Sequence, residues 1–182
     1  MFDVEQFVAD CRAALAQDQS FAAVRDVVAR AVSEPAAVIK AFGEPAYGQI
    51  QRIHRSPELT VLNVIWAPKM TIFPHNHTIA AVIGIYSGRE DNIFWRRCAD
   101  DAYHVEAIGA KALSDTDTAL LGSEIIHSVT NPIERFTGAI HVYRGDFFKA
   151  DRSEWDPGTL LERPCDPERL AQIFEDENRR LA

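Results

Sequence analysis

The first part of the chain has apolar positions at helical spacing. Apolar side chains recur every three or four residues, at Phe7, Val8, Cys11, Ala14 and Leu15. Such a stripe is typical of a helix with one buried face. A second stripe follows Ser20, a residue type that caps helix N-termini, and Pro35 and Gly43 suit the first turn and the end of a third, short helix. The pattern predicts a helical segment over residues 1–45.

From residue 46 onward the period shortens. Short segments rich in Val, Ile, Tyr, Phe and Trp alternate with Pro, Gly, Asn and Asp, and each such segment predicts a strand. The predicted strands are 48–54, 59–66, 71–77, 79–86, 92–97, 103–110, 116–121, 128–130 and 137–143. Because no helical stretch separates them, they predict an antiparallel sandwich or small barrel over residues 46–145. An irregular tail with a charged helix ending at Leu181 completes one domain, 1–182.

Composition narrows the classes of function. Of 182 residues, 47% are apolar and 25% charged, as in an ordinary folded domain. Acidic residues outnumber basic ones by 27 to 19, a net charge of −8, which disfavours nucleic acid and anionic membranes as partners. The scattered cysteines, Cys11, Cys98 and Cys165, are typical of reduced thiols. We expect a cytoplasmic protein, monomeric or a homodimer, that acts on a small molecule.

The histidines supply candidate chemistry. His75 and His77 lie two residues apart, so on a strand both imidazoles project from one face. If that face lines the barrel interior, a borderline metal ion would bind the pair. The alternative is an exposed polar pair at a strand end.

A third histidine and a missing acid refine this picture. His127 follows about fifty residues later, before a short strand that ends at an Asn-Pro pair. This arrangement resembles the metal-binding pattern of the cupin superfamily, which implies a mainly β fold, the double-stranded β-helix or small jelly-roll barrel, with the helices at its ends. Many cupins add a glutamate after the second histidine, but residues 78–83 contain no acid. Glu124 lies three residues before His127, so a strand would turn it to the other face, and we expect a solvated turn residue.

Several segments are similar to the thiol dioxygenases, the group of cysteine dioxygenase and 3-mercaptopropionate dioxygenase. They are PHNHT (74–78) beside that family's P-x-H-D-H-T, GIYSGRE (84–90) beside G-x-x-x-G-x-E, HSVTNP (127–132) beside H-x-V-x-N-P, and HVY (141–143) beside S-x-H-V-Y. The resemblance implies Fe(II) on His75, His77 and His127, with Tyr143 at the metal and His141 supporting it. The alternative for that tyrosine and histidine is ordinary packing inside the barrel.

This sequence also departs from the family. The relay serine is replaced by Ala139, so His141 loses the partner that fixes its tautomer, and the aspartate between the histidines is Asn76. No cysteine lies in residues 78–87, so the thioether cross-link to tyrosine of animal cysteine dioxygenases is not expected.

The resemblance also implies how substrate is bound. The family's mercaptopropionate branch has a glutamine on an early strand, where Gln49 stands here, and an arginine nine residues after the tyrosine, where Arg152 stands. A guanidinium can hold a carboxylate through two parallel hydrogen bonds. The alternative for Arg152 is a surface ion pair with Asp151 or Glu154.

Together these features predict an iron dioxygenase that converts a small thiol carboxylate, such as 3-mercaptopropionate, to its sulfinate with O₂. Two alternatives stay open. One is a three-histidine cupin that uses another divalent metal on a substrate without sulfur, which the loss of the serine at Ala139 favours. The other is a cupin that binds a small ligand without turnover.

Overall fold

The computed structural model describes residues 2–17 and 20–182. Three helices precede the strands and one follows them. They are α1 (Val4–Gln17), α2 (Ala22–Val32), α3 (Pro35–Phe42) and α4 (Pro167–Leu181). No helix of the described residues has the length and apolar character needed to cross a bilayer.

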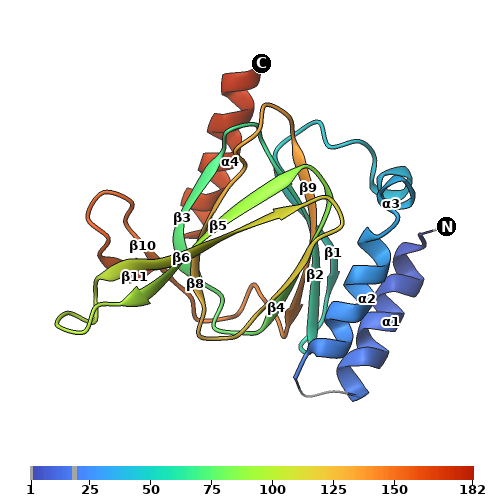
Figure 1. The fold of residues 1–182 in the computed structure, drawn as a ribbon, viewed down its shortest axis with the longest axis horizontal. Helices are drawn as coiled ribbons and strands as arrows, with labels where there is room; N and C mark the ends of the chain where they lie inside the picture. Colours follow the sequence, from blue (N-terminus) through green and yellow to red (C-terminus); the bar gives the residue numbers. More distant parts are fainter. Residues whose placement is uncertain (1, 18–19) are drawn as a thin grey trace.

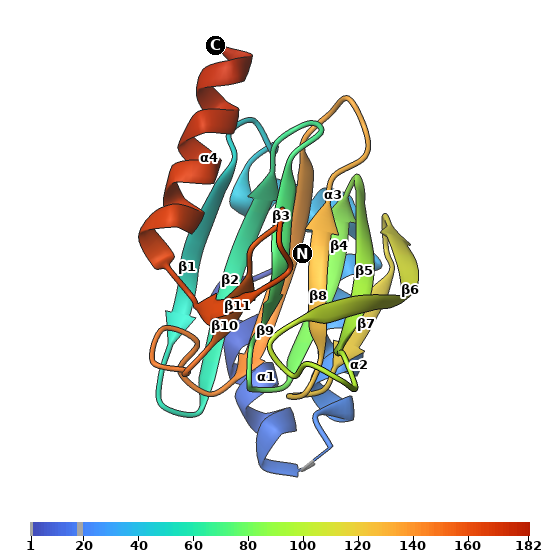
Figure 2. The same ribbon diagram turned by 90° about the vertical axis from the view of Figure 1, so that its left-hand side faces the viewer.

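The strands form two antiparallel sheets that face each other (Figures 1 and 2). One sheet has the order β1-β2-β9-β4-β7 and the other β11-β10-β3-β8-β5-β6. The strands are β1 (Gln49–Arg55), β2 (Leu59–Trp66), β3 (Thr71–Asn76), β4 (Ala81–Ser87), β5 (Arg89–Arg97), β6 (Val105–Ser114), β7 (Thr118–Leu121), β8 (Ile126–Thr130), β9 (Thr137–Arg144), β10 (Ser153–Trp155) and β11 (Glu162–Pro164). This is a double-stranded β-helix with helices at both ends, and the predicted fold class is confirmed.

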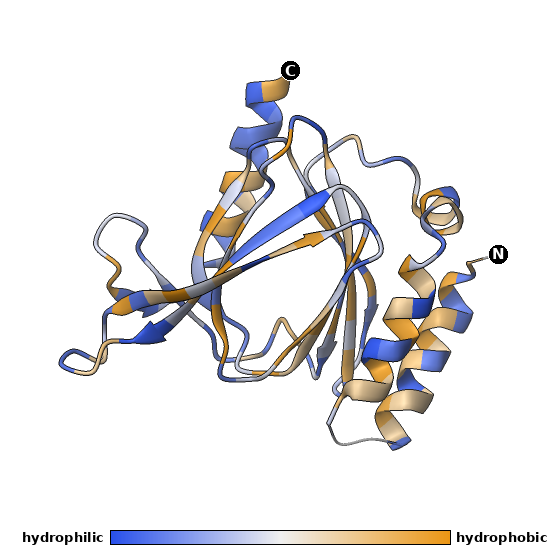
Figure 3. Cartoon of the chain, viewed as in Figure 1, coloured by the Kyte–Doolittle hydropathy of each residue, from blue (hydrophilic) through white to orange (hydrophobic). Residues whose placement is uncertain are grey.

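The N-terminal helices cover the outer face of the first sheet (Figure 1). Because one face of this sheet meets the helices and the other the barrel interior, β2 is buried along its whole length and β4 and β9 along nearly all of theirs. Such strands carry apolar residues on both faces. Figure 3 shows apolar positions along α1 and α2 interrupted by polar ones, as a helix with one packed face requires.

One glycine permits the close approach of helix and sheet. A Cβ atom on Gly84, in β4, would lie 2.4 Å from Cγ1 of Val28 in α2. No other residue type fits this contact unless the Val28 side chain or the helix moves. The first glycine of the GIYSGRE segment therefore has a packing role.

The helix α4 packs against the open end of the barrel beside β1 (Figure 2). Asn178 accepts a hydrogen bond from the backbone N–H of Gly48 at 2.7 Å and donates one to its carbonyl at 2.8 Å. Phe174 stacks on Trp66 of the inner core, with ring centroids 5.6 Å apart. The tail after β9 thus closes one end of the interior.

Three predicted details were wrong. The tail after β9 is not wholly irregular, because β10 and β11 extend the second sheet beside β3; strands of three residues are too short to show a period. The strand predicted from Asn92 begins at Arg89. Finally, the residue at the N-cap position of α2 is Phe21 at φ 66°, whose buried ring contributes to the core under the helices; Ser20 lies one residue earlier, and its hydroxyl accepts from the backbone N–H of Ala22 at 3.3 Å.

Candidate metal centre

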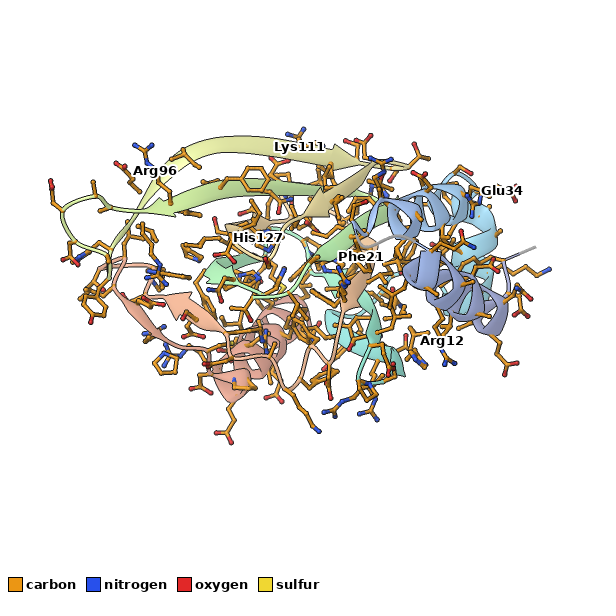
Figure 4. The ribbon with its side chains drawn as sticks, turned by 90° about the horizontal axis from the view of Figure 1, so that it is seen from below. Arg12, Phe21, Glu34, Arg96, Lys111 and His127 are labelled. Atoms are coloured by element: carbon orange, nitrogen blue, oxygen red, sulfur yellow. The ribbon has the colours of Figure 1, made fainter. Side chains whose placement is uncertain are left out.

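Three histidines converge inside the barrel. His75 is on β3, His77 directly follows that strand, and His127 is on the neighbouring strand β8, opposite His75 in the antiparallel register. The Nε2 atom of His77 lies 3.2 Å from that of His75 and 3.3 Å from that of His127. One ligand atom from each residue lies within 4.8 Å of the other two. Figure 4 shows His127 in the interior, whereas Arg96 and Lys111 lie on the outer side of the β5–β6 hairpin.

Hydrogen bonds on the far side of two rings leave their Nε2 atoms free. Nδ1 of His75 is 3.0 Å from the carbonyl oxygen of Phe73, and Nδ1 of His127 is 2.7 Å from Oδ1 of Asn92. Because both oxygens can only accept, each Nδ1 donates its hydrogen, and the lone pair of each ring lies on Nε2. This orientation by an outer partner is characteristic of histidines that bind a metal.

Burial keeps the three rings neutral. It lowers the pKa of His75 to about 4, and it lowers the pKa of His77 and of His127 well below the ordinary value, with neighbouring histidines adding to both shifts. Neutral imidazole is the form that coordinates metals. The cluster is therefore ready for a cation near pH 7.

No carboxylate joins this cluster among the described residues. Glu124 is exposed in the turn before β8, as predicted. Asn76 points to the neighbouring chain segment, where its Oδ1 accepts from the backbone N–H of Ser153 at 2.8 Å. The cluster consequently offers three neutral ligands and adds no negative charge.

Tyr143 and His141 lie beside the cluster, on one face of β9. The Tyr143 ring meets the His77 ring edge-on, with centroids 5.0 Å apart, and its hydroxyl is 3.1 Å from Nδ1 of His141. Burial raises the pKa of Tyr143 far above its ordinary value, so its hydroxyl keeps its hydrogen. Ala139 is fully buried on the same strand.

A cavity of about 40 Å³ adjoins the three histidines and Tyr143, and Arg152 forms part of its wall. The guanidinium carbon of Arg152 lies 4.0 Å from the centre of the Phe147 ring, and its buried Nε has no hydrogen-bond partner. No ion pair within residues 2–17 and 20–182 includes Arg152, because Glu154 pairs with other arginines. The surface ion pair considered as its alternative is therefore not formed.

The structure does not bring Gln49 to the histidines. This exposed side chain lies at the start of β1, in a wider groove of about 380 Å³ whose wall also includes Arg152. The two spaces share Ile50, Phe147, Arg152 and Leu170. Cys165, which the sequence predicts only as a reduced thiol, also lines the inner cavity.

Two polar residues behind the cluster have no role in the sequence-based prediction. Asn92 holds His127, and its Nδ2 donates to Oε1 of Glu90 at 3.0 Å. Both side chains are buried, although the segment around them is rich in charged residues. Glu90 and Asn92 are two residues apart, so on a strand they share one face. Their shared face on β5 is the signal that could have identified them.

The chain matches no protein-family model and no curated protein sequence. Solved structures similar to it include a cupin family protein with a double-stranded β-helix fold from Methanocaldococcus jannaschii (6% identity, 59% of this chain and 87% of that chain, TM-score 0.47). A conserved protein with a double-stranded β-helix domain from Klebsiella pneumoniae (14% identity, 64% and 87%, TM-score 0.47) is also similar. A third is the dimethylsulfoniopropionate (DMSP) lyase DddQ from Ruegeria pomeroyi (18% identity, 57% and 46%, TM-score 0.44), of which this chain spans less than half. The fold assignment rests on the strand order of the protein itself.

Proposed function

We propose that this protein is a thiol dioxygenase that binds iron and converts a small thiol carboxylate, such as 3-mercaptopropionate, to its sulfinate. The observation that carries the proposal is the set of three neutral imidazoles without a carboxylate, beside a small cavity that also contacts Tyr143 and Arg152. The resemblance of the surrounding segments to thiol dioxygenases supports the same reaction.

The cluster fits a divalent transition metal. Imidazole nitrogens suit iron, zinc, copper and nickel, and the two outer hydrogen bonds hold His75 and His127 with Nε2 toward the common centre. Iron held by the three histidines would supply the redox chemistry that joins both atoms of O₂ to the sulfur of the substrate. Because the protein ligands are neutral, an anionic thiolate would meet an undiminished positive charge.

The cavity selects small substrates. Its volume of about 40 Å³ has room for a thiol and a few carbon atoms, not for a bulky group. Arg152 is suited to hold the carboxylate end of such a substrate, since its buried Nε lacks a partner and its guanidinium plane is steadied on Phe147. Gln49, farther out in the groove, would contact only a substrate that extends beyond the cavity.

Tyr143 would act on the sulfur end. Its neutral hydroxyl is held by His141 at the side of the cavity next to His77. A fixed hydroxyl there can accept a hydrogen bond from the thiol as it enters the cavity. The Tyr143→Phe variant should therefore keep metal and lose rate.

The test is oxygen uptake by protein reconstituted with iron, measured with 3-mercaptopropionate, cysteine and a thiol that lacks a carboxylate. We expect uptake that depends on the thiol, with the sulfinate as product and the acid substrates preferred. The His127→Ala variant, which removes one proposed ligand, should retain no stoichiometric iron and show no uptake.

One observation favours a second candidate, a metal enzyme of the same fold that acts on a substrate without sulfur. Ala139 stands where the thiol dioxygenases have the relay serine. If iron-loaded protein consumes no oxygen with any thiol, this candidate replaces the first.

A further inference from the structure

We propose that Glu90 is a positioning residue that takes over the part of the absent serine. It would fix the hydrogen of His141 on Nε2 and thereby aim the lone pairs of Tyr143 into the cavity. The inference rests on the proposed function only for its effect on rate, because the hydrogen-bond arrangement exists without substrate or metal.

Glu90 is a buried acid surrounded by donors. It is 0% exposed on β5, and Trp66 donates its indole N–H to Oε2 at 2.8 Å while Asn92 donates to Oε1 at 3.0 Å. No lysine or arginine forms an ion pair with it in the described part of the chain. Burial of a carboxylate without a cationic partner costs free energy. Its presence here therefore indicates a role other than packing.

The third neighbour is His141. Its Nε2 lies 3.6 Å from Oε2 of Glu90 and has no hydrogen-bond partner. This distance is longer than a hydrogen bond, yet the negative charge of the carboxylate favours an N–H that points toward it. When the ring carries one hydrogen, that hydrogen therefore belongs on Nε2.

The direction of the remaining bond follows. With its hydrogen on Nε2, His141 can only accept at Nδ1, so the Tyr143 hydroxyl, 3.1 Å away, must donate to it. The lone pairs of the Tyr143 oxygen are then left for the cavity, where they can accept from a thiol. A serine hydroxyl can donate or accept, whereas a carboxylate enforces this one direction.

The same acid supports a candidate metal ligand. Oδ1 of Asn92 accepts from His127, so the amide must turn its NH₂ group toward Glu90. Glu90 thus holds Asn92, which orients His127, and it faces His141, which orients Tyr143. One side chain therefore supports both a candidate metal ligand and the tyrosine beside the cavity.

The variant Glu90→Gln tests this because all three neighbours present donors. A glutamine has the same size and shape as Glu90, but its amide NH₂ group would face the donor N–H of at least one neighbour and form no hydrogen bond with it. Asp91→Asn is the matched control, since Asp91 lies on the other face of the same strand and pairs with Arg89 at 2.7 Å.

The first measurement is ¹⁵N NMR of the histidine rings in metal-free protein, with the His141 signals assigned through a His141→Gln variant. We expect hydrogen on Nε2 of His141 in the natural protein and in Asp91→Asn, and a shift of that hydrogen to Nδ1, or a mixture, in Glu90→Gln. Hydrogen on Nδ1 in the natural protein, or an unchanged spectrum in Glu90→Gln, would overturn the proposal.

The second measurement is thiol-dependent oxygen uptake per bound iron. We expect kcat of Glu90→Gln to fall roughly 10- to 100-fold with KM changed far less, as for the loss of an outer partner. An unchanged kcat would show that Glu90 only packs. If the natural protein itself oxidises no thiol while the NMR result holds, the proposed function fails and the positioning role of Glu90 stands.

Discussion

Removal of the Asn92 side chain tests how the cluster is held. Asn92→Ala deletes the acceptor 2.7 Å from Nδ1 of His127 and the donor 3.0 Å from Oε1 of Glu90. Two buried polar groups lose their partner, and each such loss costs about 1–3 kcal/mol. The free energy of unfolding of the metal-free protein should fall by about 2–6 kcal/mol, a large part of the roughly 5–15 kcal/mol of a typical domain.

Metal affinity should fall as well, because His127 is no longer fixed with Nε2 toward the other rings. Loss of such an outer partner typically weakens binding 10- to 100-fold, or about 1.4–2.7 kcal/mol. The assay is competition for zinc, which has no redox chemistry, against a chelating dye, with chemical denaturation of the metal-free protein beside it.

Ser128→Ala is the matched control. Ser128 is the next residue on β8 and is also buried, but its hydroxyl accepts from the Trp95 indole at 3.0 Å, away from the cluster. It should lose about 1–3 kcal/mol of stability and keep its zinc affinity within about threefold. Equal zinc affinities for Asn92→Ala and Ser128→Ala would show that Asn92 does not orient a metal ligand.

Three further predictions concern other parts of the molecule. Arg152→Gln should raise KM for 3-mercaptopropionate at least roughly 10-fold with a smaller change in kcat, and leave a thiol without a carboxylate unaffected; steady-state oxygen uptake with both thiols checks this. Gly84→Ala should lower the free energy of unfolding by about 1–3 kcal/mol, because its Cβ would lie 2.4 Å from Val28, whereas Gly109→Ala, with nothing within 4 Å, should be neutral or stabilising in the same denaturation assay. Burial raises the pKa of the Cys11 thiol from 9.0 to about 12, so between these pH values the unfolded chain releases a proton that the folded chain retains. The free energy of unfolding should therefore fall as the pH rises through this range. A Cys11→Ala variant with the same pH dependence in chemical denaturation would contradict this prediction.

Alternation and period were sufficient to predict a sandwich or small barrel of antiparallel strands and to place His75 and His77 on one face. The ends of β2 and β9 can be predicted because residues that break strands lie on either side of their apolar runs. The shared face of His75 and His77 follows from the twofold period of a strand alone. Their convergence with His127 depends on the pairing of β3 with β8, which no local pattern states and which the resemblance supplied.

The outer polar residues could not be predicted in the same way. The sequence predicts a strand from Asn92, so Glu90 lies outside the predicted strand, where an acid is ordinary. The start of β5 at Arg89 and the burial of both side chains show that Glu90 and Asn92 face inward together. Arg152 is similar, since its neighbours Phe147 and Cys165 are brought to it by the closure of the tail on the barrel.

We propose that one cation is held by three imidazoles and by no carboxylate of the protein. The most direct measurement is a crystal structure of metal-loaded protein with anomalous diffraction at the absorption edge of the metal. We expect one ion about 2.0–2.2 Å from Nε2 of His75, His77 and His127, with no Asp or Glu oxygen at bonding distance. An ion bound elsewhere, or an acidic side chain among its ligands, would show that the three histidines are not the metal site we propose.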